Sequence, residues 1–213
     1  MTARLRLVPG PVRVERVVTA GTFSLDGDTF DVDNNVWLVG DDEEVLIVDA
    51  AHDAEAIHLA VAGRRVTAIV CTHAHDDHID AAAELAGLTD APLLLHPADH
   101  ELWAATHPDR KPDGELTDGE RLAVAGIEVQ VIHNPGHTWG SCSLYVPFLN
   151  AVFTGDTLFN GGPGATGRSY SDRPTIEASI RDRLLTLPAD TVVHTGHGQD
   201  TTIAAERPNV PAA

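Results

Sequence analysis

The sequence has little of several residue types, and each shortage excludes a class of protein. Two cysteines in 213 residues, Cys71 and Cys142, cannot form a disulfide framework, and we expect both to be reduced thiols. No segment reaches the apolar length that a membrane-spanning helix needs, so we expect no membrane partner. Aromatic residues make up only 5% of the chain, which predicts an aliphatic core.

Basic residues are also scarce. One lysine, Lys111, and thirteen arginines stand against 32 acidic residues, which gives a formal net charge of −18. Such a surface repels phosphate backbones, so we expect a small-molecule substrate and no nucleic acid. Residues 1–8 contain arginine but neither the apolar segment nor the cleavage site of a secretory signal, which favours a cytoplasmic location. The length fits a single domain over residues 1–213.

Histidine, in contrast, is concentrated in one short segment. Residues 72–78 read Thr-His-Ala-His-Asp-Asp-His, directly after residues 66–71, whose β-branched side chains predict a buried strand. Imidazoles and carboxylates at this spacing suit zinc and similar metals. Because α/β sheets place their sites at the carboxyl ends of strands, the segment predicts a metal site there.

Three further donors occur in similar settings downstream. His137 lies in a Pro-Gly turn after the predicted strand 127–132. Asp156 follows the apolar residues 151–153, and His197 follows 191–194, each with a glycine beside it. Glycine lets the backbone pass close to a crowded site. Together with the 72–78 segment, these donors predict one shared metal centre.

The order of these residues resembles that of the metallo-β-lactamase-fold hydrolases and, within them, the glyoxalase II-like (hydroxyacylglutathione hydrolase-like) group. The family pattern is an aspartate at the end of an early strand, then H-x-H-x-D-H, then a single His, Asp and His. The resemblance covers roughly residues 12–205. The matching residues are Asp49, His73, His75, Asp77, His78, His137, Asp156 and His197.

This resemblance implies an α/β protein, an αββα sandwich of two mixed sheets flanked by helices. It also implies two divalent metal ions, zinc foremost, with iron or a zinc–iron pair as alternatives. Asp77 and Asp156 would be the catalytic carboxylates, and Asp49 would accept an N–H from a ligating histidine. The first ion would be held by His73, His75 and His137, and the second by Asp77, His78 and His197, with Asp156 between them.

The function implied is a dinuclear metal-dependent hydrolase of thioesterase type. A metal-bridged hydroxide would attack a small thioester. Residues 167–170, Gly-Arg-Ser-Tyr, are similar to a Gly–basic–x–Tyr element that contacts the substrate carboxylate in glyoxalase II-like enzymes. We therefore expect Arg168 and Tyr170 to bind substrate, since a guanidinium and a phenol both donate to carboxylates.

Three features depart from the glyoxalase II-like pattern. The chain ends 16 residues after His197, without the helical extension that completes the glutathione site in those enzymes. Asp80 stands where glycine is common and Trp139 where proline is common, and their roles stay open. These departures point toward a low-molecular-weight thiol other than glutathione. The acyl group and the oligomeric state are not indicated by the sequence.

Three alternatives remain. A lactone, β-lactam or phosphoester hydrolase of the same fold is one, although Ser141 stands where lactonases often have a second histidine. A mononuclear iron persulfide dioxygenase shares H-x-H-x-D-H, but its loop after the aspartate differs from residues 156–159. A non-catalytic binding module is disfavoured because every ligand is present.

The periodicity and turn residues also predict the elements. Strands are expected at 12–20, 35–39, 45–48, 66–71, 91–96, 122–124, 127–132, 142–146, 151–153 and 191–194. Helices are expected at 53–62, 77–87, 97–106, 175–187 and 201–206.

Overall fold

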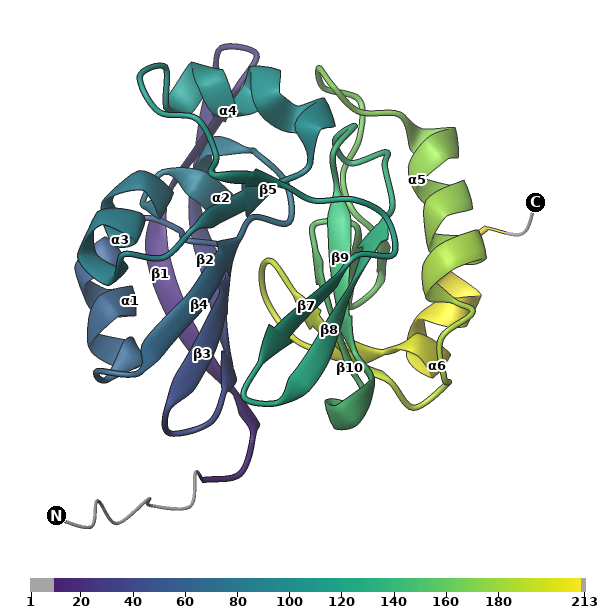
Figure 1. Ribbon diagram of the computed structural model, residues 1–213. Coiled ribbons are helices and arrows are strands. Elements are labelled where there is room, and N and C mark those ends of the chain that lie inside the picture. The colour runs from purple at the N-terminus through teal and green to yellow at the C-terminus, as the bar shows by residue number, and fades with distance from the viewer. Residues whose placement is uncertain (1–9, 212–213) are drawn as a thin grey trace, which may run out of the picture.

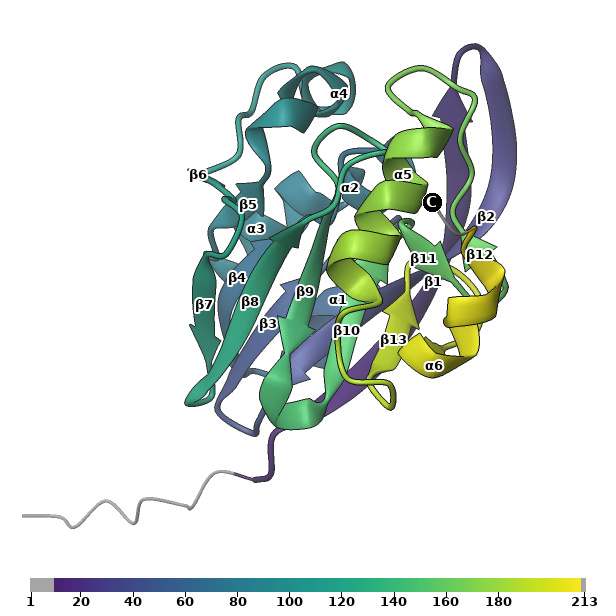
Figure 2. The same ribbon diagram turned by 90° about the vertical axis from the view of Figure 1, so that its right-hand side faces the viewer.

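Two stacked β-sheets with helices on both outer faces form the protein (Figure 1). The computed structural model describes residues 10–211. Helices α1 to α4 cover one sheet, and α5 and α6 cover the other (Figures 1 and 2). The αββα sandwich expected from the sequence is confirmed. Residues 1–8, on which the prediction about a secretory signal rests, lie outside the described residues.

The first sheet is mixed and has the order β1-β2-β3-β4-β5-β6. Its first three strands are antiparallel, and β3 to β6 run parallel. The parallel strands bring their carboxyl ends to one edge, where the histidine-rich segment follows β4. The strands are β1 (Arg13–Leu25), β2 (Asp28–Gly40), β3 (Glu44–Val48), β4 (Arg65–Val70), β5 (Leu93–Leu95) and β6 (Gly114–Glu115).

The second sheet has the order β14-β13-β10-β9-β8-β7 and is antiparallel except for the pair β10–β13. A two-stranded ribbon, β11 (Leu158–Phe159) with β12 (Gly162–Pro163), follows β10. The six strands are β7 (Arg121–Val124), β8 (Ile127–His133), β9 (Cys142–Val146), β10 (Ala151–Gly155), β13 (Val192–Thr195) and β14 (Thr201–Thr202).

Three apolar layers hold the sandwich together. In β2, Val36 and Leu38 face the helices while Trp37 and Val39 face the other sheet, because successive side chains of a strand point to opposite faces. The middle layer also contains Phe153 of β10. A third layer lies between the second sheet and α5 and α6. Both faces of each sheet are thus buried, which explains the near-continuous apolar runs in the central strands.

The helices lie where the sequence predicts them, but two of the predicted helices are not continuous α-helices. Asp53 caps α1, its carboxylate accepting from the Ala56 N–H. The helix expected at 77–87 is broken into two, with residues 80 and 81 between them. The helix expected at 175–187 continues after Ser179 as a π-helical turn to Leu184. The helices are α1 (Ala54–Val61), α2 (Asp76–Ile79), α3 (Ala82–Thr89), α4 (His100–Thr106), α5 (Arg173–Ser179) and α6 (Ile203–Glu206).

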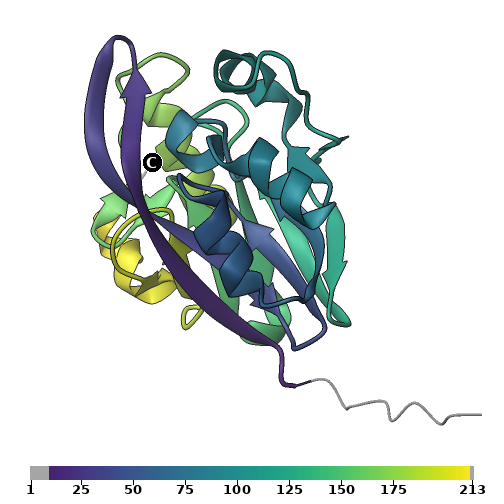
Figure 3. The ribbon, with the colours of Figure 1, turned by 90° about the vertical axis from the view of Figure 1, so that its left-hand side faces the viewer.

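The largest difference from prediction is a long hairpin. Strands β1 and β2 pair without interruption from Arg13 with Gly40 to Leu25 with Asp28, whereas the predicted strands covered only 12–20 and 35–39. The hairpin extends beyond the sheet as a two-stranded arm (Figure 3). Most residues near its tip are exposed, so the apolar pattern that identifies buried strands is missing there.

Within residues 10–211, none of the helices is long and apolar enough to cross a membrane.

Candidate metal centre

All the predicted donors meet at one edge of the sandwich. Asp49 follows β3, and residues 72–78 follow β4, with Asp77 and His78 in the single turn of α2. His137, Asp156 and His197 follow strands β8, β10 and β13 of the second sheet. The centre therefore lies where the two sheets meet, with donors from both.

One set of donors consists of three buried imidazoles. The Nδ1 of His75 lies 3.1 Å from the Nε2 of His73 and 3.0 Å from the Nε2 of His137. Within the described chain these three residues form one of three groups whose donor atoms all lie within 4.8 Å of one another. This is the set that the sequence predicts for the first metal ion.

The second set combines Asp77, His78 and His197. The Nε2 atoms of the two histidines are 3.2 Å apart, and the Nε2 of His197 lies 3.3 Å from the Oδ2 of Asp77. Asp156 faces both sets: one carboxylate oxygen is 3.2 Å from His78, and the other is 3.6 Å from His137. Asp156 thus occupies the place of the predicted bridging ligand.

Protein acceptors fix the tautomers of four histidines. The Nδ1–H of His78 donates to Asp49 (2.9 Å), and that of His73 donates to the Thr72 hydroxyl (3.1 Å), which itself donates to Asp49. The Nδ1–H groups of His137 and His197 donate to backbone carbonyls, at 2.9 and 2.7 Å. Each ring therefore directs the lone pair of its Nε2 into the centre. Asp49 has the contact that the sequence predicts for it.

The arrangement of these lone pairs fits bound cations. The Nδ1 of His75 lies at about hydrogen-bond distance from the Nε2 of both His73 and His137, so three imidazole nitrogens are gathered within 4.8 Å of one another. The buried Oδ1 of Asp156, which faces His78, has no hydrogen-bond partner among the described residues. Imidazole nitrogens with carboxylates are the donor set of zinc and of iron. The residues present therefore fit two divalent ions.

Electrostatics separate the two donor sets. Burial and the neighbouring imidazoles lower the pKa of His75 to about 3 and hold the pKa of His73 well below its usual value, so both rings are neutral. Burial opposes charge on His197 too, but Asp156 and Asp77 raise its pKa to about 10. A cation in the second set would therefore replace the proton on His197, and the carboxylates of Asp77 and Asp156 supply the negative charge that favours it.

Asp99, a residue that sequence reasoning missed, holds the two ligand loops together. Its buried carboxylate accepts from the Ala74 N–H (3.0 Å) between two ligands, and from the Thr138 hydroxyl (2.7 Å) and Gly140 N–H (2.6 Å) beyond His137. Burial raises the pKa of Asp99. Its sequence context, His-Pro-Ala-Asp, reads as a helix start and gave no signal of this role.

A small cavity of about 90 Å³ adjoins the first set. Phe23 and Leu25 of the hairpin line it together with His75 and His137. Arg168 also lines this cavity, as the sequence prediction requires, but its guanidinium donates to the carboxylate of Asp28 (3.1 Å).

Tyr170 does not line the cavity. The nearby carboxylate of Glu101 raises the pKa of Tyr170. Of the two predicted substrate residues, the structure therefore brings only Arg168 to the centre.

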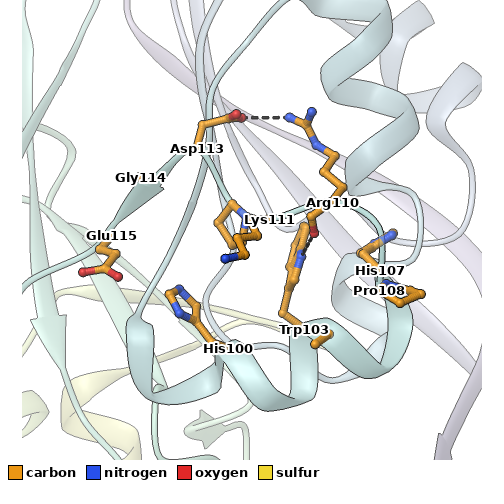
Figure 4. A pocket seen from close by; sticks show the side chains of 11 residues that line it. His100, Trp103, His107, Pro108, Arg110, Lys111, Asp113, Gly114 and Glu115 are labelled. Carbon is orange, nitrogen blue, oxygen red and sulfur yellow. Dashed lines mark hydrogen bonds and ion pairs between the residues drawn. The ribbon is translucent and has the colours of Figure 1, made fainter.

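A second hollow, of about 560 Å³, lies beside α4 and holds none of the donors. Trp103 stands in its middle, and the Arg110 guanidinium is paired with Asp113 at 2.8 Å (Figure 4). Lys111 and Glu115 bring one further charge of each sign. The balanced charges, and the absence of every donor that the sequence predicts for the metal ions, set this hollow apart from the candidate centre.

Comparison with known proteins agrees with this geometry. Residues 29–197 match the model of the metallo-beta-lactamase superfamily. The chain belongs to this superfamily. Among relatives, the probable metallo-hydrolase YqgX of Bacillus subtilis is 32% identical over 83% of this chain and 90% of the relative. The hydroxyacylglutathione hydrolase of Aeromonas hydrophila is 33% identical over 78% of this chain and 61% of the relative, so the match spans less than two thirds of that enzyme.

Solved structures of the superfamily give the same picture. The BLEG-1 B3 metallo-beta-lactamase superposes with a TM-score of 0.76 at 31% identity, covering 91% of this chain and 98% of that one. TTHA1623 in a di-iron-bound form superposes with a TM-score of 0.76 at 34% identity, covering 84% of this chain and 95% of that one. ETHE1 from Myxococcus xanthus superposes with a TM-score of 0.71 at 27% identity, covering 84% of this chain and 78% of that one. The chain shares the metallo-beta-lactamase fold, in which two mixed sheets are flanked by helices.

Proposed function

We propose that the protein is a dinuclear metal-dependent hydrolase that cleaves a small thioester. The observation that carries the proposal is the convergence of two donor sets, with Asp156 facing both at 3.2 and 3.6 Å. When bound, the two cations would supply a water activated at neutral pH and positive charge for a carbonyl oxygen. The solved relative with two bound irons supports a centre for two ions.

The thioester preference is supported by the relatives and by the cavity. Relatives with the name hydroxyacylglutathione hydrolase match at 33–36% identity. Phe23, Leu25 and Ala165 give the cavity beside His75 and His137 an apolar wall, which suits a short acyl or thiol chain. Both cysteines are buried and their thiol pKa values are raised by burial, so neither is suited to act as the nucleophile.

Within this proposal the chain's own residues have defined tasks. The fixed tautomers of His73, His78, His137 and His197 orient the site before substrate arrives. Arg168 lies at the rim of the cavity, where a substrate carboxylate would compete with Asp28 for its guanidinium. Both partners of this pair are partly exposed, so the exchange costs little.

The test combines metal content with activity. Gently purified protein is expected to contain about two metal ions per chain, and to hydrolyse hydroxyacyl thioesters of glutathione or of another low-molecular-weight thiol. Asp156→Asn should lower metal content and abolish turnover, while Asp109→Asn, an exposed carboxylate, should change neither. Full metal content with no thioester cleaved would remove the thioester assignment, and normal activity in Asp156→Asn would remove the bridging role.

Arg168 is tested separately. Arg168→Ala should raise KM more than it lowers kcat for a thioester with a remote carboxylate, since the lost contact lies away from the reacting carbonyl. Asp28→Asn, which frees the guanidinium, should lower KM for the same substrate. An unchanged KM in both variants would show that Arg168 only ties the loop to the hairpin.

A persulfide dioxygenase is the second candidate, because the H-x-H-x-D-H element of residues 73–78 is shared with that class of enzyme. It predicts one iron per chain, little zinc, and oxygen uptake with a persulfide. The same metal analysis decides between the two, because two ions per chain with thioester turnover would exclude the mononuclear site.

A further inference from the structure

A line of polar contacts runs from the surface to the carboxylate of Asp77. The Nδ2 of Asn34 donates to the Oδ2 of Asp77 (3.0 Å), and the Oδ1 of Asn34 lies 2.9 Å from the Nε2 of His52. The Nδ1 of His52 lies 2.9 Å from the Oδ2 of Asp80. Asn34 belongs to β2, His52 to the loop before α1, and Asp80 to the break between α2 and α3. Three separate segments therefore meet behind one metal-site carboxylate.

This line is built into the fold. Asn34 is 1% exposed and the His52 ring 4%, while Asp80, 37% exposed, reaches the surface. The Oδ1 of Asp80 accepts the backbone N–H groups of His52 (2.6 Å) and Ala81 (2.9 Å), so the carboxylate is fixed on both oxygens. Asp80, whose role the sequence left open, thus secures the position of His52.

The backbone conformation of His52 and a glycine on β1 both make room for the His52 ring. His52 has φ +63°, a left-handed conformation that histidine adopts at some cost. On β1, Gly21 faces the ring, and a Cβ at this position would overlap its atoms. A strained residue and an obligatory glycine are thus both needed to seat the imidazole against Asn34.

Hydrogen-bond polarity makes the arrangement directional. A carboxylate accepts only, so Asn34 must turn its Nδ2 toward Asp77 and its Oδ1 toward His52. The Nε2–H of His52 then donates to Asn34 and prevents the amide from flipping. Asn34 thus holds the same carboxylate oxygen of Asp77, Oδ2, that faces the Nε2 of His197 at 3.3 Å.

We propose that Asn34, His52 and Asp80 are positioning residues that hold Asp77 in place for the second metal ion. The proposal rests on the two-metal function proposed above. No hydrogen bond found among residues 10–211 joins these three residues to His73, His75 or His137. The effect is therefore confined to one of the two ions, which a merely structural role would not produce.

The experiment is a titration of metal-free protein with Zn²⁺ in competition with a chromophoric chelator. Wild type should bind two ions, and Asp77→Asn identifies the step that depends on Asp77. Asn34→Leu should weaken that same step by about 10–100-fold, the usual effect of removing a partner of a ligand, and leave the other step unchanged.

His52→Asn and Asp80→Asn extend the test without a change of backbone shape. Asparagine tolerates the left-handed conformation at residue 52 but is too short to reach Asn34. Both variants should weaken the same step, by less than Asn34→Leu. His58→Asn, an exposed histidine of α1, is the matched control and should bind as wild type. Thermal unfolding of each metal-free variant checks that it is folded.

The outcomes are distinguishable. A wild type that binds a single ion overturns the two-metal function, and the positioning proposal with it. Two ions in wild type, with both steps or neither step weakened in Asn34→Leu, overturn the positioning role alone. Selective weakening in Asn34→Leu and His52→Asn supports it.

Discussion

At the scale of single residues, Asp99 shows how one buried carboxylate joins two ligand loops. The two carboxylate oxygens of Asp99 accept from three donor groups. In Asp99→Asn only one side-chain oxygen remains as an acceptor, and the NH2 group that replaces the other faces N–H or hydroxyl donors. A buried polar group without a partner costs about 1–3 kcal/mol. We expect the free energy of unfolding of the metal-free protein to fall by about that amount, measured by chemical denaturation. Asp109→Asn, on the surface, is the control, and equal stability of the two variants would contradict the role of Asp99.

His96 gives stability a pH dependence away from the metal centre. Its ring stacks on His133 with centroids 4.0 Å apart, and burial together with His133 lowers its pKa to about 4. The unfolded chain, with the ordinary value of 6.5, binds a proton at higher pH than the native protein does. The contribution of His96 is therefore present above pH 6.5 and lost as the pH falls toward about 4.

We expect His96→Gln to lose less stability than wild type over this pH window. Free energies of unfolding of metal-free protein at about pH 6.5 and about pH 4.5 measure the difference. His58→Gln, which changes an exposed histidine, should follow wild type. If the free energies of unfolding of His96→Gln and of wild type fall by the same amount, the pKa of His96 is the same in the native and in the unfolded protein.

At the scale of elements, the sequence predicted the donors better than the strands that carry them. Metal donors are particular residue types that follow strands, so the sequence alone identified seven candidate ligands. All seven lie together in the structure. Strand limits depend instead on burial, and the exposed outer half of the β1–β2 hairpin gave no periodic signal. The break of the helix at residues 80 and 81 was missed, and the contact of Asp80 with His52 at this break spans 28 positions, beyond the reach of local periodicity.

Contacts between side chains of distant segments were likewise beyond prediction. Arg168 was identified as a basic residue of the right loop, but its pairing with Asp28 depends on a hairpin that extends toward it. Asp99 and Asn34 carry no local pattern, since their partners lie 18 to 43 positions away. Local periodicity and donor motifs thus predict the layers and the centre, while tertiary geometry decides the residues that support them.

The turn that carries His137 depends on Gly136. This residue has φ +131°, and a Cβ there would overlap the backbone of Ile176 in α5. Gly136→Ala should lose about 1–3 kcal/mol to backbone strain, and further stability because the turn must move away from α5. Gly126→Ala is the control, because Gly126 also has positive φ (+76°) but open space around its Cβ position. Equal losses of stability in the two variants, measured by chemical denaturation, would show that crowding against α5 is unimportant.

At the scale of the whole molecule, the centre links the two halves of the sandwich. One donor group follows β4 of the first sheet, and the others follow β8, β10 and β13 of the second. The bound cations would therefore hold the two sheet edges together, and they would offset two carboxylates in a chain of net charge −18. Metal binding and global stability should be coupled in this protein, because the unfolded chain does not bring these donors together.

Removal of metal should accordingly lower the melting temperature of the entire chain. A ligand at 100 times its dissociation constant stabilises the native state by about 2.7 kcal/mol, and tighter ions by more. We expect chelation to lower Tm in one cooperative transition, and Zn²⁺ to restore it. Mg²⁺, which prefers oxygen donors, should restore little at an imidazole-rich centre. In Asp156→Asn the Zn²⁺-dependent rise should shrink, because Asp156 faces both donor sets. Thermal unfolding followed by circular dichroism measures all of these, and a Tm that is indifferent to Zn²⁺ in wild type would contradict the coupling.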